Sequence, residues 1–487
     1  MPTYDLIVRG GTVATAVDVM RCDIAIKAGK IAAIGENLGD ASEVVDAGGA
    51  LVTPGGVDSH CHIEQLSAMG VVNADTFETA TGSAALGGTT TVIPFACQHK
   101  GMDIAEVARD YHALARRGSI ADYALHLIVT DPTPVTMNEH LPALAKDGHG
   151  SIKVFMTYDA MKIDDGEMLD VLLKARELGT MVCVHAENHG MIKWMVQRLL
   201  DRGYTAPKYH AISHPRGSEA EAFNRLIAMS ELIDQPIMIF HVSTAEGAAT
   251  VNAARARGVK VWAETCPQYL FLTKEDLDKP GMEGAKWCCS PPPRGEADIE
   301  ALWAALERGD LQTVTSDHAP FSFDEKGKLS AGPNPTFKQI PNGMPGLQVR
   351  MPLMFDAIVS RGRMEVTDFV RLMSTAPAQL YNLADRKGSI AVGKDADIVV
   401  WDTEREVTLT DEMMADATGY TPFVGRTLKG WPATVLRRGE VVVKDGMLTG
   451  KPGSGEFLPR TGGRAAAPRG KVAPEFDPAQ NFGAKLL

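Results

Sequence analysis

The chain has 487 residues, of which 45% are apolar and 23% charged, and its formal net charge is -12. This length allows one large α/β barrel with an accessory domain, and the composition is that of a globular protein rather than a disordered or fibrous one. The negative charge and the lack of a long basic run argue against a nucleic-acid partner, so we expect a small-molecule substrate.

The first 50 or so residues alternate short β-rich runs with glycine turns, at residues 5–9, 24–26 and 31–34. This pattern predicts a small antiparallel sheet. The same alternation of β-rich runs and turns occurs near the other end, at residues 397–401, 434–436 and 439–443. We therefore predict that residues 1–54 and 386–451 together form one β-sandwich domain.

Between these two ends, apolar strand-like runs alternate with helix-length segments, as expected of βα units around a parallel sheet. Strands are predicted at residues 90–93, 124–128, 152–156, 181–185, 237–241 and 311–315, and helices at 164–178 and 218–232. The natural assembly is a (β/α)8 barrel, the TIM-barrel architecture, over residues 55–385.

The last segment, residues 452–487, is rich in Gly, Pro, Arg and Ala and shows no periodic pattern. Such a segment is predicted to be a C-terminal arm or a disordered tail. As an arm, it could wrap a neighbouring subunit.

A His-x-His pair, His60 and His62, follows an apolar approach at residues 52–58. Residues two apart in a strand project to the same side, so both imidazoles can bind one metal ion. A surface or packing coincidence is the alternative for such a pair taken alone.

Three further candidates stand where predicted strands end. His185, His241 and Asp317 each close an apolar run and are followed by polar residues. Active sites of α/β barrels are built from side chains at those strand ends. A hydrogen-bonded core histidine is the alternative for each one singly, but three equivalent placements favour a shared site.

Lys153 lies inside the apolar run at residues 152–156, where an unpaired ammonium is costly to bury. One solution is an ion pair with a neighbouring strand. The other is loss of the proton followed by addition of carbon dioxide, which gives a carbamate whose two oxygens bridge two divalent cations. Because four candidate histidine ligands accompany this lysine, we favour the carbamylated lysine.

These residues predict a two-metal centre. One ion would take His60, His62, the Lys153 carbamate and Asp317, and the second would take the carbamate, His185 and His241. A bridging water between two cations becomes hydroxide near neutral pH, and the ions also polarise a carbonyl. Asp317 would then act as general base and acid, taking the proton and returning it to the departing nitrogen.

With these residues the chain resembles the amidohydrolase superfamily and, within it, the dihydropyrimidinase and hydantoinase family of cyclic amidases. The resemblance runs from DLIVRGG at residues 5–11 to GKDAD at 393–397. The matching blocks between them are TPGGVDSHCH (53–62), KVFMTY (153–158), HAEN (185–188), HVS (241–243), ETCPQYL (264–270), CSPPPR (289–294) and TSDH (315–318).

The resemblance implies three substrate-binding positions. Tyr158 would donate a hydrogen bond to the tetrahedral oxyanion, a preorganised contact of the kind that carries much of acyl-transfer catalysis. Ser290 and Asn342 would hold the ring amide through their backbone groups. The alternatives are a packing aromatic at Tyr158, a turn residue at Ser290 and a tight turn at Asn342.

Some residues depart from the family pattern. Glu64 stands where dihydroorotase-like relatives carry an arginine that holds a substrate carboxylate, which argues against that substrate. Residues 65–70 and 97–101 also differ from the common hydantoinases, and we expect these loops to border the pocket that receives the ring substituent.

The function implied is opening of the cyclic amide bond of dihydropyrimidines or 5-substituted hydantoins, which gives N-carbamoyl amino acids. Two alternatives remain: an allantoinase or cyclic imide hydrolase with the same metal centre, and a non-enzymatic dihydropyrimidinase-related scaffold. A phosphate-binding barrel is excluded because no Gly-x-x-x-x-Gly-Lys-Ser/Thr loop occurs.

The expected cofactors are two divalent ions. A histidine-rich site with a carboxylate suits zinc, and cobalt, manganese or nickel could substitute. The resemblance implies a homotetramer or homodimer. Seven scattered cysteines, an odd number, indicate reduced thiols, and no secretory signal or membrane-length apolar run is present, so we expect a cytoplasmic protein.

Overall fold

The structure is a computed structural model that describes residues 2–471 and 473–486. Parallel strands form a curled barrel sheet in the order β14-β13-β12-β11-β10-β9-β7-β6, with β8 paired to β7. The strands are β6 (Gly56–Cys61), β7 (Thr89–Cys97), β8 (Asp122–Tyr123), β9 (His126–Ile128), β10 (Ser151–Phe155), β11 (Met181–His185), β12 (Ile237–Ile239), β13 (Val261–Thr265) and β14 (Thr313–Val314).

The barrel closes between its first strand and the chain that follows its last. Cys61 and His318 form a parallel bridge, and the His62 N–H donates to the His318 carbonyl at 2.6 Å. The predicted (β/α)8 barrel is confirmed, although β9, β12 and β14 are shorter than the apolar runs indicated. As a result, His241 and Asp317 lie just beyond the hydrogen-bonded ladder.

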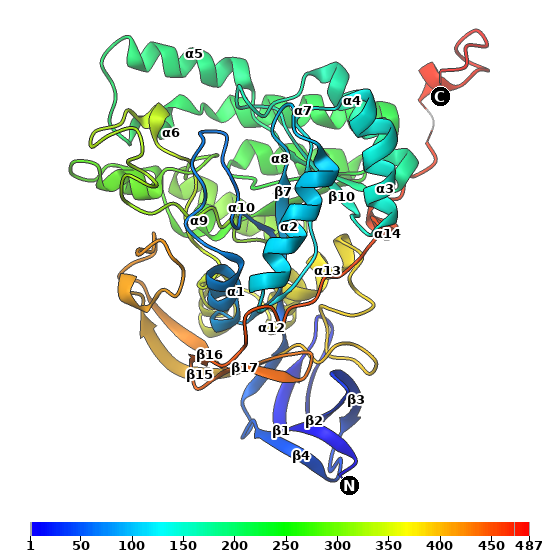
Figure 1. The fold of residues 1–487 in the computed structure, drawn as a ribbon, viewed down its shortest axis with the longest axis vertical. Helices are drawn as coiled ribbons and strands as arrows, with labels where there is room; N and C mark the ends of the chain where they lie inside the picture. The colour runs from blue at the N-terminus through cyan, green and yellow to red at the C-terminus, as the bar shows by residue number, and fades with distance from the viewer. Residues whose placement is uncertain (1, 472, 487) are drawn as a thin grey trace.

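Helices surround the barrel, as Figure 1 shows. They are α1 (Phe77–Leu86), α2 (Ile104–Gly118), α3 (Leu141–Lys146), α4 (Asp165–Leu178), α5 (His189–Leu200), α6 (Tyr209–Ser213), α7 (Arg216–Ile233), α8 (Ala245–Ala256), α9 (Pro267–Phe271), α10 (Glu296–Arg308), α11 (Arg350–Phe355), α12 (Val366–Val370) and α13 (Ala376–Leu380). Single π-helical turns at Asp356–Ser360 and Arg371–Thr375 extend α11 and α12.

Helix α4 illustrates how local sequence sets these boundaries. Asp164 accepts from the Glu167 N–H at 2.8 Å, and the Glu167 carboxylate accepts from the Asp164 N–H at 2.8 Å. This reciprocal capping box fixes the start of the helix, and Gly179, at φ +64°, ends it. The predicted helix at 164–178 is confirmed.

The two chain ends meet in a second, nine-stranded sheet in the order β18-β17-β16-β15-β5-β1-β2-β3, with β4 paired to β1. Its strands are β1 (Tyr4–Ala14), β2 (Val19–Lys27), β3 (Lys30–Gly35), β4 (Ala41–Asp46), β5 (Leu51–Pro54), β15 (Ile398–Thr408), β16 (Thr427–Arg437), β17 (Glu440–Lys444) and β18 (Met447–Leu448). The expectation of a purely antiparallel N-terminal sheet was wrong, because β4 and β5 both pair with β1 in parallel.

A buried ion cluster joins this sheet to the barrel. The Lys387 ammonium lies 2.6 Å from Asp122 of β8, 3.1 Å from Asp395 and 2.8 Å from Asp397, just before β15. Lys387 is 2% exposed, so the three carboxylates offset the cost of burying its charge. The cluster fixes the end sheet against the barrel.

The beginning of the predicted C-terminal arm packs along the barrel of its own chain. The Leu458 N–H donates to the Tyr123 carbonyl at 2.7 Å, and the buried Arg460 donates to the Ser151 hydroxyl at 2.7 Å. Ser151 opens β10, so the arm contacts the N-terminal ends of the barrel strands. A short helix, α14 (Gly463–Ala466), follows.

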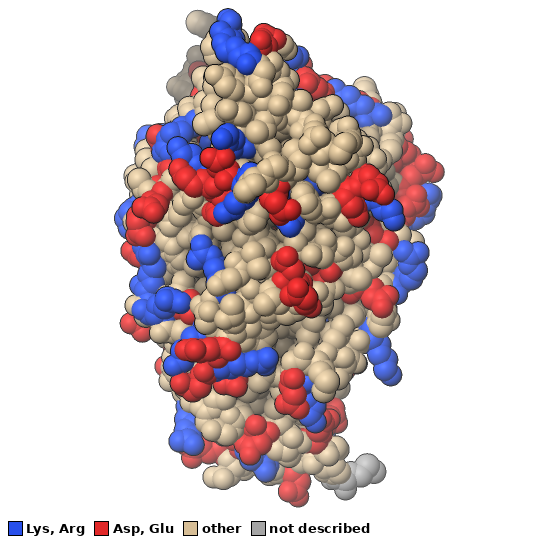
Figure 2. Space-filling view, turned by 90° about the vertical axis from the view of Figure 1, so that its left-hand side faces the viewer, with Lys and Arg blue, Asp and Glu red and all other residues tan. Residues whose placement is uncertain are grey.

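The surface carries charges of both signs. Figure 2 shows Lys and Arg side chains interspersed with Asp and Glu over the face that it displays. All seven cysteines are buried and free. Among the helices of the described residues, none combines the length and the apolar character needed to cross a membrane.

Candidate metal centre

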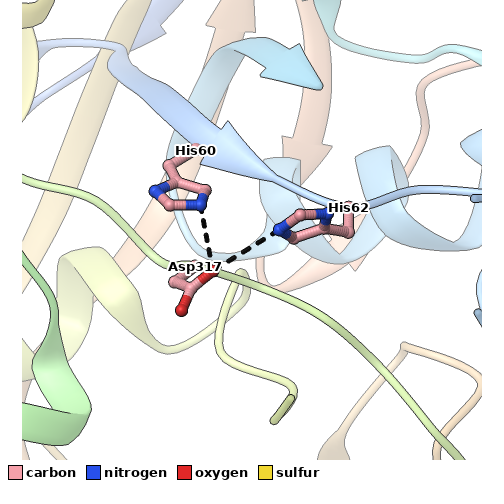
Figure 3. A group of neighbouring side chains, drawn as sticks. All are labelled: His60, His62 and Asp317. Atoms are coloured by element: carbon pink, nitrogen blue, oxygen red, sulfur yellow. Dashed lines mark ion pairs between the residues drawn. The ribbon is translucent and has the colours of Figure 1, made fainter. Parts of the chain in front are cut away.

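His60, His62 and Asp317 converge at the C-terminal end of the barrel. His60 belongs to β6, His62 follows that strand, and Asp317 lies three residues beyond β14. The Asp317 carboxylate lies 3.1 Å from Nε2 of His60 and 3.6 Å from Nε2 of His62 (Figure 3). One ligand atom from each residue lies within 4.8 Å of the others, a spacing that fits a shared metal ion.

A second layer of side chains orients the two imidazoles. Glu264 of β13, which is fully buried, lies 2.5 Å from Nδ1 of His60. Gln65 accepts from Nδ1 of His62 at 2.7 Å. Because each Nδ1 is occupied, Nε2 of both rings is left to face Asp317, which is how ligating histidines are usually held.

His185 and His241 lie beside this trio. Their ring centroids are 4.4 Å apart, and the His241 ring lies 5.5 Å from that of His60. His185 ends β11, and its Nε2 is bound by Glu187 at 2.8 Å, so Nδ1 is the ring nitrogen left for a ligand role. The structure therefore gathers all four predicted histidines at one end of the barrel.

Lys153 projects into the barrel interior, because Ile152 and Val154 pack outward in the core beneath the helices. Its ammonium is fully buried and lies 3.9 Å from the ring centroid of Phe240 and 4.9 Å from that of Phe155. Within the described residues the Nζ atom has no hydrogen-bond partner. The ion pair considered as the alternative is therefore not what the structure contains.

The electrostatics give the protonation states that metal ligands require. Burial lowers the pKa of Lys153 to about 7, and it holds the pKa of His185 and of His241 well below the ordinary value. Burial also opposes ionisation of Asp317, but His60 and His62 outweigh it and keep the pKa of that carboxyl well below its usual range. Burial therefore favours the uncharged forms of Lys153, His185 and His241 beside an ionised Asp317. His60 differs, because Asp317 and Glu264 outweigh burial and raise its pKa.

Three residues of this region adopt a left-handed backbone that side chains other than glycine rarely take. The φ angles are +71° at Tyr158, +42° at His241 and +46° at Asp317. Such strain costs about 1–3 kcal/mol per residue and persists where the surroundings impose it, which is common at functional sites. Here it directs side chains from the strand ends toward the centre.

The predicted substrate-binding residues lie around this centre. The Tyr158 ring centroid is 5.2 Å from that of His185. Burial raises the pKa of the Tyr158 phenol, and the polar side chains of Ser290 and Asn342 oppose that rise. The phenol therefore keeps its proton and can act as a donor.

The loops singled out by their departures from the family pattern also border this end of the barrel. Glu64 turns to Arg117, at 3.1 Å, and caps the first N–H of α1 at 3.0 Å. Nε2 of His99 lies 3.0 Å from the Leu66 carbonyl, which ties the two unusual loops together. Glu64 therefore contacts helices α1 and α2, and one hydrogen bond links the two loops.

No individual role was predicted for Glu264, Gln65 or Glu187, although Glu264 and Glu187 lie in blocks that match the family and Gln65 lies in the unusual loop at residues 65–70. Glu264 carried a signal that could have found it, because it is a carboxylate inside the apolar strand β13, just as Lys153 is an ammonium inside β10. Gln65 and Glu187 stand in polar loops, where the residue type alone does not distinguish a side chain that supports a ligand from a solvated one.

A barrel with histidines and an aspartate at the ends of its strands is typical of metal-dependent hydrolases. The sequence profile of the amidohydrolase family matches residues 51–442. The chain is 44% identical to a D-hydantoinase of Ralstonia pickettii, over 94% of this chain and 99% of that one.

Solved structures agree with this assignment. A dihydropyrimidinase from Brevibacillus agri superposes with a TM-score of 0.91 at 38% identity, covering 95% of this chain and 99% of that one. An L-hydantoinase (dihydropyrimidinase) from Arthrobacter aurescens gives 0.85 at 28% identity, covering 94% and 100%. The chain belongs to the amidohydrolase family, and its His60, His62 and Asp317 cluster supports divalent-metal binding.

Proposed function

We propose that this protein hydrolyses the cyclic amide bond of 5-substituted hydantoins or dihydropyrimidines and releases N-carbamoyl amino acids. The observation that carries the proposal is Lys153, a fully buried ammonium without a hydrogen-bond partner in the described chain, beside His185, His241 and Asp317. The names of the relatives, D-hydantoinase and dihydropyrimidinase, support this substrate class.

The proposed ligands divide into two sets. His60, His62 and Asp317 would hold one divalent ion, His185 and His241 would hold a second, and a carbamate on Lys153 would bridge the two. Zinc suits these donors. When bound, the ions supply a Lewis acid for the carbonyl and lower the pKa of water.

The residues of the chain would then share the remaining chemistry. Asp317 accepts the proton of the attacking water and returns it to the ring nitrogen as the C–N bond breaks. Tyr158 donates to the carbonyl oxygen as the carbon becomes tetrahedral. The backbone groups of Ser290 and Asn342 hold the ring amide in register with these two side chains.

The test is a substrate panel run on the metal-loaded protein. It contains hydantoins with different 5-substituents, dihydrouracil, allantoin, dihydroorotate, succinimide and phthalimide. Turnover confined to allantoin or the imides would replace the proposed substrate. If the protein bound no metal and turned over none of these substrates, the non-enzymatic scaffold would be the remaining alternative. A carbamate carbon signal in NMR after exposure to labelled bicarbonate tests the modification of Lys153.

We also propose the domain division predicted above: residues 1–54 and 386–451 as the β domain, 55–385 as the catalytic barrel and 452–487 as an arm. The pairing of β5 with β15 supports it, since this contact unites the two ends of the chain. A cytoplasmic homotetramer or homodimer completes the proposal. Light scattering on the purified protein tests the assembly.

A further inference from the structure

A second buried lysine, Lys328, lies in the long loop that follows β14. Its side chain is fully shielded from solvent, and it is not part of the predicted ligand set. Burying an ammonium is costly unless every one of its hydrogens finds an acceptor. The contacts of Lys328 therefore call for an explanation.

The ammonium has three donors, and three backbone carbonyls receive them. Nζ of Lys328 donates to the carbonyls of Cys288 at 2.9 Å, Pro341 at 2.7 Å and Gly343 at 2.5 Å. These acceptors lie on two segments more than 50 residues apart in sequence. The Gly343 N–H also donates to the Cys288 carbonyl at 2.9 Å, so the segments lie directly against each other.

These two segments carry the proposed contacts to the ring amide. Ser290 lies two residues after Cys288, and Asn342 lies between Pro341 and Gly343. Among the described residues, neither Ser290 nor Asn342 uses its backbone N–H or carbonyl in a hydrogen bond. The carbonyls that flank these positions are engaged, and those of Ser290 and Asn342 are left for a ligand.

The geometry of Gly343 shows how closely the second segment is held. Its φ is +145°, and a Cβ built on it would lie 2.4 Å from the carbonyl oxygen of Ala319. The backbone at Asn342 is therefore held closely against the chain that leaves the metal centre, and Lys328 binds the carbonyls of the residues before and after it. Small displacements here would move the bound ring amide relative to Asp317 and Tyr158.

We propose that Lys328 is a positioning residue that clamps the segments at Ser290 and Asn342 into one binding edge for the ring amide. It acts through backbone carbonyls and touches neither the metal ligands nor the substrate. This inference rests on the proposed cyclic-amide hydrolysis, and it assigns that reaction a residue which the sequence motifs do not contain.

The test compares Lys328→Met with Lys387→Met in the full-length, metal-loaded protein. Both variants replace a buried lysine by methionine, but Lys387 lies in the ion cluster between barrel and end sheet. Hydrolysis of the substrate that the wild type turns over best gives kcat and KM. Hydrogen exchange, followed by mass spectrometry, reports on the peptides that contain Ser290 and Asn342. Metal content is measured for each variant.

Lys328→Met is expected to keep its metal and lose about 10–100-fold in kcat/KM, mainly through KM, because a small misplacement of a bound substrate is enough to cost that much. The Ser290 and Asn342 peptides should exchange faster in this variant only. Lys387→Met should lower Tm and leave KM unchanged. If Lys328→Met does not fold, Lys328→Gln replaces it, since a neutral amide offers fewer donors than the three carbonyls need.

The proposed role of Lys328 would be refuted if the Lys328 variant had the KM of the wild type and if both of its peptides exchanged at the wild-type rate. Equal losses of kcat/KM in the Lys328 and Lys387 variants would also overturn it, because they would reveal a general loss of stability. Failure of the wild type on every cyclic amide would instead refute the proposed function. In that case the proposed role of Lys328 would be tested only by hydrogen exchange at the peptides that contain Ser290 and Asn342.

Discussion

Replacing Glu264 by glutamine tests whether the second layer of the centre tunes its metal affinity. Glu264 lies 2.5 Å from Nδ1 of His60, and the two side chains are 0% and 1% exposed, so solvent does not screen their interaction. Glutamine keeps the acceptor oxygen but removes the charge. It also buries an NH2 group at the position of Oε2, an atom that has no hydrogen-bond partner in the described chain.

Two losses follow from this geometry. Loss of the partner behind a ligating histidine weakens metal binding by about 10–100-fold. We expect the lower end, about 10-fold or 1.4 kcal/mol, because one hydrogen bond survives. The unsatisfied amide lowers the free energy of unfolding by about 1–3 kcal/mol.

The assay is competition between the protein and a chelator for zinc, with Kd taken from the metal distribution at equilibrium. Asp298→Asn is the matched control, since Asp298 is also a buried carboxylate but pairs with Arg216 between helices. It should lower stability without changing Kd. An unchanged Kd for Glu264→Gln, or the same weakening in both variants, would refute the reasoning.

Three further outcomes are expected. Tyr158→Phe removes only the phenol hydroxyl, so kcat should fall about 10²–10³-fold with metal content unchanged; a wild-type kcat would rule out the oxyanion contact. Asp395 has its pKa lowered from 3.8 to about 2 because Lys387 and two further cations outweigh the effect of burial. Its stabilisation is therefore present above the ordinary carboxyl pKa and is lost as pH falls toward 2. The Tm difference between wild type and Asp395→Asn should shrink over that range, and a constant difference would contradict the assignment. Gly343→Ala should raise KM and lower Tm, because its Cβ would meet Ala319; normal kinetics would show that the Asn342 segment tolerates displacement.

The barrel and the convergence of the candidate ligands at one of its ends could be predicted because each signal is local. Apolar runs mark buried strands, and a histidine or aspartate at the end of such a run falls at the mouth of a barrel whatever its neighbours are. Lys153 was recognisable for a similar reason, since the cost of burying an ammonium depends on the strand around it rather than on distant contacts.

The supporting contacts could not be predicted because they join distant parts of the chain. Glu264 meets His60 across 204 residues of sequence, and Lys328 joins the Cys288 and Gly343 carbonyls only after three loops have folded together. The parallel pairing of β4 and β5 with β1 was missed for the same reason. Alternation reveals which residues of a strand are buried, and it does not reveal the direction of the neighbouring strand.

The most direct test of the two-metal account is the metal content of Lys153→Ala, measured together with hydantoin ring opening. The wild type should hold two divalent ions per chain, and the variant should lose both its metal and its activity. A Lys153→Ala protein that is folded and retains two tightly bound ions would contradict the bridging role of this lysine.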